Sequence, residues 1–151
     1  MDPIIIQTEG AKISLYPDGP LWQDRPAATL GNFTSRDAAS GRAVLAQALD
    51  QLRAMGTAQV IGPMEGDTWH SYRFVTETDD SPPFLLEPSN KPYAPALFLE
   101  AGFQPIGSYF SARVALTDAP PPPPPSADFT ITPWSGDNPE ALFSQVFDQI
   151  G

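Results

Sequence analysis

The sequence predicts a domain of the α/β (α+β) class, with a mixed, mainly antiparallel sheet around a central βαβ unit. Two segments with strand character, 12–16 and 27–34, are separated by a turn at 17–20, so they can pair antiparallel. A helical segment, 37–55, then leads by short connections into a short apolar strand, 59–62. Short connections around one helix imply two parallel strands joined by a right-handed crossover.

The remaining elements of this body follow from apolar spacing and from helix-ending residues. The long helix should end before Gly56, a residue typical of helix ends. A second, shorter helix is expected over 92–101, stopped by Gly102, and a strand over 103–116. The apolar stripe of the long helix consists of Val44, Leu45, Ala48, Leu49, Leu52 and Met55.

Proline marks a boundary near the end of the chain. Nineteen of the 151 residues are proline, against an average usage of about 5%. Six of them are consecutive, residues 120–125, and such a run forms a polyproline II rod of about 19 Å. It is either a plain linker between domains or a ligand for a proline-recognising groove.

The sequence therefore divides into a body (1–119), a polyproline linker (120–127) and a tail (128–151). The tail contains a predicted strand, 128–134, and a predicted helix, 139–150, which begins with Asn138 as N-cap and proline at the first position. One strand and one helix cannot enclose a core. The tail must dock on the body, on another chain, or on further residues.

Charge and cysteine content exclude several classes of function. Eight basic and 18 acidic side chains give a net charge of −10, which argues against a nucleic acid or an anionic membrane as partner. The absence of cysteine removes disulfide scaffolds and thiolate zinc sites, and with a single histidine we expect no metal site. The N-terminus has neither the basic start nor the apolar stretch of a signal peptide. We expect a soluble, cytoplasmic protein.

The turn into the long helix is rich in small residues and carries Arg36 and Arg42. Backbone N–H groups at a helix start attract anions, and small side chains let an anion approach them. The turn therefore fits a phosphate or pyrophosphate site. Ser, Asp and Gly at a helix start also serve as ordinary caps, which is the alternative interpretation.

Four motifs carry a resemblance to a known family. They are Gly41-Arg42-Ala43 at the helix start, Gly102-Phe103 after the second helix, and between them Thr68-Trp69-His70-Ser71-Tyr72-Arg73 with Pro83-Phe84-Leu85-Leu86-Glu87-Pro88. Over residues 29–116 the chain resembles the GNAT superfamily of N-acetyltransferases, and within it a poorly characterised acetyltransferase-like branch. The resemblance implies an acyl-CoA N-acyltransferase-like fold whose parallel strands splay apart near Thr34 and Gly62 to hold the pantetheine.

By the same resemblance, acetyl-CoA or another acyl-CoA is the cosubstrate, and its acyl group passes to an unidentified amine. The implied catalytic candidates are His70 and Glu87 as base and Tyr72 or Tyr93 as acid. Alternatively, His70 is a surface or packed histidine and Glu87 pairs with Arg73. The cofactor-binding candidates are Phe33, Thr34, Ser35, Arg36, Ser40, Gly41, Arg42 and Ala43.

The chain also departs from the family pattern. The pyrophosphate loop of the family reads Gln/Arg-x-x-Gly-x-Gly/Ala, but its first position here is Ala38, with Arg36 two residues earlier. Phe98 stands where many members have the tyrosine that protonates the departing thiolate. The usual first strand and first two helices are not expected before residue 30.

The tail, in contrast, resembles the family's first strand and first helix. It either begins a second GNAT-like domain of a truncated tandem, or completes the first by folding back or across a homodimer. The alternative to an enzyme is a non-catalytic GNAT-like module for CoA sensing or for interaction with a domain or protein.

Overall fold

The computed structural model describes residues 2–115, 117, 121–124, 136, 140, 143, 144 and 146. The chain falls into two units, Met1–Ser108 and Tyr109–Gly151. In the second unit, residues 109–115 and 121–124 have no regular structure, and the four described residues from 140 to 146 are helical. The predicted tail strand, 128–134, lies outside the described residues, as does most of the predicted tail helix.

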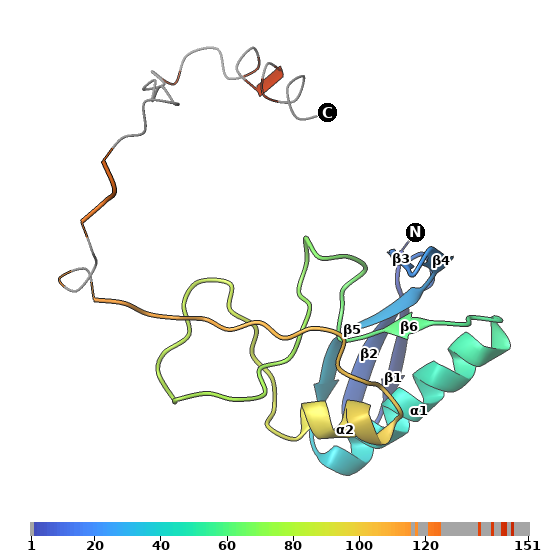
Figure 1. Ribbon diagram of the computed structural model, residues 1–151. Helices are drawn as coiled ribbons and strands as arrows, with labels where there is room; N and C mark the ends of the chain where they lie inside the picture. The colour runs from blue at the N-terminus through green and yellow to red at the C-terminus, as the bar shows by residue number, and fades with distance from the viewer. Residues whose placement is uncertain are drawn as a thin grey trace. The chain divides into compact units, whose positions relative to one another are not determined.

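A four-stranded sheet forms the centre of the first unit (Figure 1). Its strand order is β1-β2-β5-β6, where neighbouring strands pair antiparallel except for the last pair. β5 and β6 are parallel and pair only through Ala28 with Val60 and Thr29 with Ile61. The prediction of a mixed, mainly antiparallel sheet with a βαβ unit is thus confirmed. The four strands are β1 (Ile4–Thr8), β2 (Ala11–Tyr16), β5 (Ala28–Ser35) and β6 (Val60–Ile61).

β1 is not among the predicted strands, and a simple turn is predicted before β5; the structure differs at both points. β1 joins β2 through a two-residue turn in which Gly10 has a φ of 86°, a left-handed conformation that glycine adopts without strain. Before β5, a small hairpin pairs β3 (Leu21–Trp22) with β4 (Arg25–Pro26). Its turn residues, Gln23 and Asp24, have φ values of 51° and 60°. Such turns usually contain Asn-Gly, so the sequence carried no signal for this one.

Both predicted helices of the body are present. α1 (Ala38–Ala54) packs against β1, β2 and β5, and α2 (Ala94–Glu100) lies beside the first turns of α1 (Figure 1). The stripe predicted for α1 is buried except for Leu49, which is half-buried, and Met55, which caps the helix and is exposed.

Phe98 joins α2 to the sheet. Its side chain is only 3% exposed. The ring lies with its centroid 5.4 Å from that of Phe33, 4.9 Å from Phe74 and 5.0 Å from Phe103. A Cβ atom at Gly62 would come within 3.0 Å of the Phe98 ring. Phe98 therefore fills the space between β5 and the chain that leaves β6, where the sequence analysis expected pantetheine.

The strand predicted over 103–116 is wrong for its described part, because residues 103–115 contain no strand. Pro105 has no N–H to donate to a neighbouring strand, and Gly107 favours an irregular backbone. Phe103 is taken up by the contact with Phe98. Packing of Phe103 at one end, and proline and glycine within the segment, therefore account for the absence of a strand in this described part.

We predict that Phe98→Ala lowers the free energy of unfolding by about 3–5 kcal/mol, because it removes a buried ring with aromatic contacts on three sides. Leu99→Ala on the same helix is the matched control, since Leu99 is 54% exposed. Urea denaturation followed by circular dichroism measures both. Equal losses for the two variants would contradict a central role for Phe98.

Candidate functional site

The start of α1, at the end of β5, is closed by its own side chains. Oδ1 of Asp37, the N-cap, accepts hydrogen bonds from the backbone N–H of Ser40 at 2.8 Å and from its hydroxyl at 2.8 Å. In return, the Asp37 N–H donates to the Ser40 hydroxyl at 3.3 Å. The bond from the Ser40 N–H, with further bonds from its hydroxyl and from Arg36, lowers the pKa of Asp37 to about 2. A charged carboxylate thus sits where the sequence analysis expected a phosphate.

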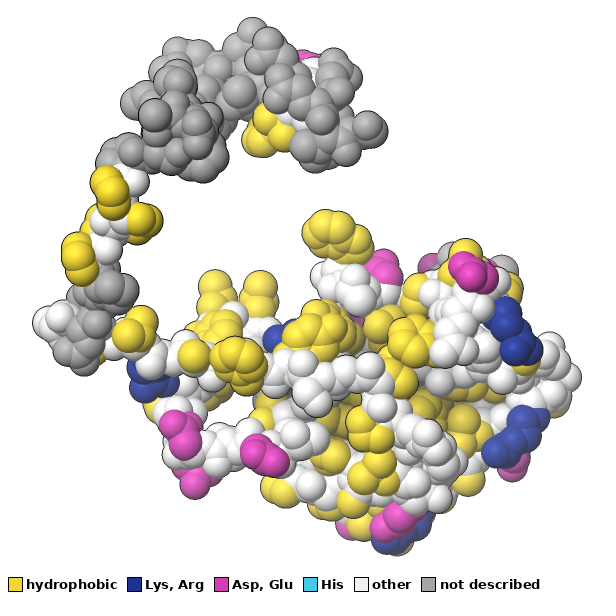
Figure 2. All heavy atoms as spheres, viewed as in Figure 1, with side chains coloured by type: hydrophobic (Ala, Val, Ile, Leu, Met, Phe, Trp, Pro, Cys, Tyr) yellow, Lys and Arg dark blue, Asp and Glu magenta, His cyan; other side chains and the backbone are white. Residues whose placement is uncertain are grey.

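The two arginines of this region also face carboxylates. Nε of Arg36 lies 3.3 Å from Oδ2 of Asp37, and the Arg36 side chain covers the β1–β2 turn at Gly10. Nε of Arg42 donates to Glu100 at 2.6 Å, which raises the pKa of Arg42 and lowers that of Glu100. Figure 2 shows basic groups beside acidic ones at several points on the viewed face. Neither arginine is held ready for an anionic ligand.

Gly41 serves the packing of α1 against α2. A Cβ atom there would lie 2.6 Å from Cδ1 of Leu97 and 3.1 Å from both the Phe33 ring and Oγ of Ser35. Leu97 is buried and cannot easily withdraw. The glycine that the sequence analysis assigned to cofactor binding therefore allows two helices to meet closely.

The other predicted cofactor residues have ordinary structural surroundings. Phe33 is half-buried in the aromatic cluster, and Thr34 is exposed on β5 opposite Lys12. Ser40 is engaged by Asp37, and Ala43 is exposed on α1.

Among the four catalytic candidates, Tyr93 contacts a predicted cofactor residue, Ser35. Its hydroxyl donates to the Ser35 carbonyl oxygen at 3.0 Å and lies 3.2 Å from the Ser35 hydroxyl. Tyr93 is the N-cap of α2, so these bonds tie the beginning of α2 to the end of β5. A weakly acidic hydroxyl is thereby placed beside the start of α1.

Tyr72 and Glu87 meet at Arg73. Nη1 of Arg73 donates to the Tyr72 hydroxyl at 3.2 Å, and the guanidinium lies 5.1 Å from the centre of the tyrosine ring. Nη2 of Arg73 is 3.9 Å from Oε1 of Glu87. The alternative interpretation of Glu87, an ion pair with Arg73, is the arrangement present.

His70 lies apart from these residues and lines a hollow in the surface. Its imidazole is 63% exposed, with Nδ1 2.8 Å from Oδ1 of Asp67, and this bond is the main cause of the lowered pKa of Asp67. The hollow has a volume of about 450 Å³ and is also lined by Tyr16, Asp18 and Glu65. The structure therefore distributes the four catalytic candidates over three places, and Tyr93 is the one at the start of α1.

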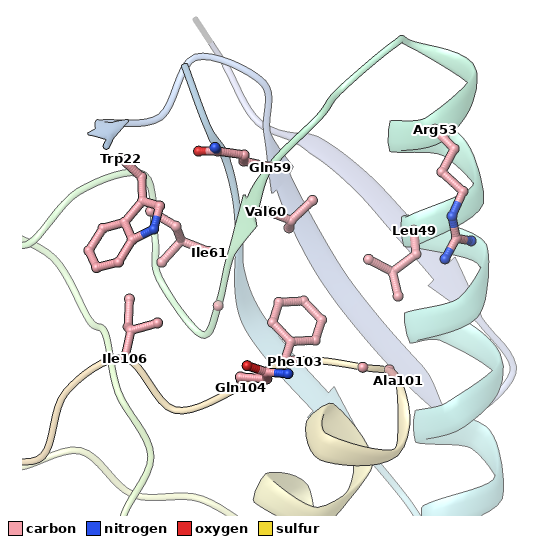
Figure 3. Close-up of a pocket in the computed structure, with 12 residues that line it drawn as sticks. Trp22, Leu49, Arg53, Gln59, Val60, Ile61, Ala101, Phe103, Gln104 and Ile106 are labelled. Carbon is pink, nitrogen blue, oxygen red and sulfur yellow. The ribbon is translucent and has the colours of Figure 1, made fainter. Parts of the chain in front are cut away.

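A second hollow, of about 340 Å³, was missed by the sequence analysis (Figure 3). It lies beside β6, where Leu49 and Arg53 project from α1 and Trp22 and Ile106 stand across from them. Its lining comes from four separate segments, so no local motif marks it. Arg53 is paired with Asp50 at 2.6 Å. The hollow has aromatic and aliphatic walls and no convergent pair of catalytic groups among its lining residues.

No protein-family model, curated protein or solved structure matches this chain. Among the described residues, no group of three or more His, Asp or Glu side chains is arranged to hold a metal ion. Within the same part of the chain, neither helix has the length and apolar character needed to cross a membrane.

We predict that Gly41→Ala destabilises the protein. Overpacking against Leu97 costs about 1–3 kcal/mol, whereas the gain in helix propensity is at most about 1 kcal/mol. The double variant Gly41→Ala/Leu97→Ala should lose less than the sum of the single losses, because the shorter side chain makes room. Urea denaturation of the four proteins gives the coupling energy. A stabilised Gly41→Ala protein would show that the close approach of the helices is unnecessary.

We also predict a characteristic pH dependence at Asp37. Its folded-state pKa of about 2 is below the ordinary value of 3.8, so its contribution to stability is complete above the ordinary value. That contribution is lost as the pH falls through about 2. Asp37→Asn retains an acceptor oxygen but does not titrate. The difference in urea midpoint between wild type and Asp37→Asn should therefore narrow from neutral pH to pH 2, and a constant difference would contradict the cap.

Proposed function

We propose that residues 2–108 form a GNAT-like module that acts by binding protein and does not transfer acyl groups. The observation that carries this proposal is at the start of α1. There the Asp37 carboxylate accepts the hydrogen bond of the Ser40 N–H, so this N–H is not available to a ligand. In the GNAT-like interpretation, this helix start is the place for the cofactor pyrophosphate.

Electrostatics at this helix start supports the proposal. Two unit charges of the same sign 4 Å apart repel by about 1 kcal/mol in water and about 4 kcal/mol near a protein surface. A pyrophosphate beside Asp37 meets this repulsion, while Arg36 and Arg42 are already paired with acidic groups. Displacing Asp37 instead would break the cap of α1.

The groups needed for acyl transfer are also dispersed. Such a reaction needs a base for the amine, donors for the oxyanion and an acid for the thiolate. Phe98 has no proton to give and is buried. Glu87 and Tyr72 both contact Arg73, and His70 lies at another hollow. A protein partner also agrees with the net charge of −10, which disfavours nucleic acid.

A second candidate function is transfer of an acyl group from acyl-CoA to an amine. The observation in its favour is the position of Tyr93, whose hydroxyl lies beside Ser35 at the end of β5. In this candidate, Tyr93 protonates the departing thiolate in place of the residue at position 98.

We also propose a cytoplasmic location, because the chain contains no cysteine.

Calorimetric titration with acetyl-CoA separates the two candidates. For an interaction module we expect no saturable heat with millimolar acetyl-CoA and no thioester consumption in the presence of amines. Saturable binding of acetyl-CoA would overturn the first proposal. Turnover lost in Tyr93→Phe but retained in Tyr72→Phe would establish the second, because the Tyr93 hydroxyl donates to the Ser35 carbonyl oxygen.

A further inference from the structure

β1 is an edge strand of the sheet. It pairs with β2 on one side, and no other described strand pairs with it. Its outer backbone N–H and C=O groups therefore face no strand in the described part of the chain. We propose that β1 pairs antiparallel with β1 of a second copy of this chain, so that one sheet runs through both copies.

β1 lacks the features by which edge strands usually avoid such pairing. Natural edges are protected by charged side chains, proline, bulges or very short strands. β1 has five residues, Ile4-Ile5-Ile6-Gln7-Thr8, and none of them is charged or proline. Its register with β2 is unbroken from Ile4 opposite Leu15 to Thr8 opposite Ala11, so it contains no bulge.

The Ile5 side chain on this edge is exposed to solvent, and pairing with another strand would reduce that exposure. Ile5 points to the face opposite Ile6 and is 56% exposed, although it is large and apolar. Gln7 lies on the same face as Ile5 because residues two apart share a face. A strand placed beside β1 would cover part of the Ile5 side chain.

A second copy fits this edge because the sequence of β1 is self-complementary about Ile6. Antiparallel pairing about a two-fold axis sets Ile6 opposite Ile6 of the second copy, and Ile4 opposite Thr8. It also sets Ile5 opposite Gln7 of the second copy, twice. Each side chain then meets one that points to the same face, so the helix-covered faces of the two sheets become continuous.

The distribution of charge favours β1 over other parts of the surface as the place where two copies meet. The whole chain carries a net charge of −10, so most pairs of surfaces repel when two copies meet. β1 carries no charge. The acidic residues that flank it, Asp2 and Glu9, come opposite Gly10 and Pro3 of the second copy and do not face each other.

This proposal rests on the proposed interaction role and adds to it by naming the partner as a second copy of the chain. Separate experiments can contradict the interaction role and the dimer. Acetyl-CoA turnover would overturn the proposed function without affecting a dimer, whereas a monomeric protein would overturn the dimer without restoring an acyl-CoA site.

The test uses two double variants of the full chain that differ only at position 5. In Ile5→Glu/Gln7→Glu, the proposed register sets like charges opposite each other at two places. In Ile5→Lys/Gln7→Glu, the same register sets opposite charges there. Both positions are exposed, and in each variant the glutamate at position 7 lies opposite Lys12 of its own chain. Both proteins should fold, as circular dichroism will verify.

Sedimentation equilibrium at physiological salt, with protein up to about 1 mM, gives the association state. We expect wild type to dimerise, Ile5→Glu/Gln7→Glu to lose at least about tenfold in association constant, and Ile5→Lys/Gln7→Glu to recover it. A monomeric wild type, or equal association of the two variants, would overturn the proposal. A further outcome would also overturn the proposal: the protein is monomeric, the amides of β1 exchange slowly, and this slow exchange disappears when residues 128–151 are deleted. The tail, and not a second copy, would then pair with β1.

Discussion

The packing of Phe98 against Phe33, Phe74 and Phe103 determines where α2 meets the rest of the first unit. Once that ring is in place, the neighbouring residues of the same short helix are positioned too. Leu97 comes against Gly41, and Glu100 comes within reach of Arg42. Tyr93, at the beginning of the helix, reaches the end of β5. The surroundings of the α1 start therefore depend on an apolar contact that has no chemistry of its own.

At that start, the dipole of α1 is satisfied from within the chain. Helix N-termini attract negative charge, and here the charge is the carboxylate of Asp37, held by Ser40. Ion pairs at an exposed surface contribute little to stability, typically about 0–1 kcal/mol. Their larger effect here is on recognition, because the carboxylates paired with Arg36 and Arg42 offset the positive charge of this region. This arrangement agrees with the interaction role proposed above.

Sequence patterns predicted the elements whose signals are local. The apolar stripe and Gly56 marked α1, and Gly102 marked the end of α2. β1 went unassigned because three consecutive isoleucines do not alternate with polar residues. The β3–β4 turn was missed because Gln23-Asp24 is not a usual hairpin turn. Gly41 was identified from its position at the helix start. Its close approach to Leu97 had no local signal, because the two residues are more than 50 positions apart in the sequence. Capping by Ser, Asp or Gly at this helix start was an alternative interpretation of the sequence, but the effect of Asp37 on an anion site depended on its hydrogen bonds to Ser40. The hollow beside β6 draws on four segments and had no local signal.

The two-residue turn at Gly10 has a consequence for the order of folding. Contacts between β1 and β2 close the shortest loop in the sheet, whereas β5 and β6 can pair only after α1 has crossed between them. Local contacts form early because little chain entropy is lost in closing them. We therefore expect the β1–β2 hairpin to form before the parallel pair. In a newly made chain, the strand edge that accepts another copy would then exist before the core that Phe98 completes, and the net negative charge of the chain would be its main protection against premature association.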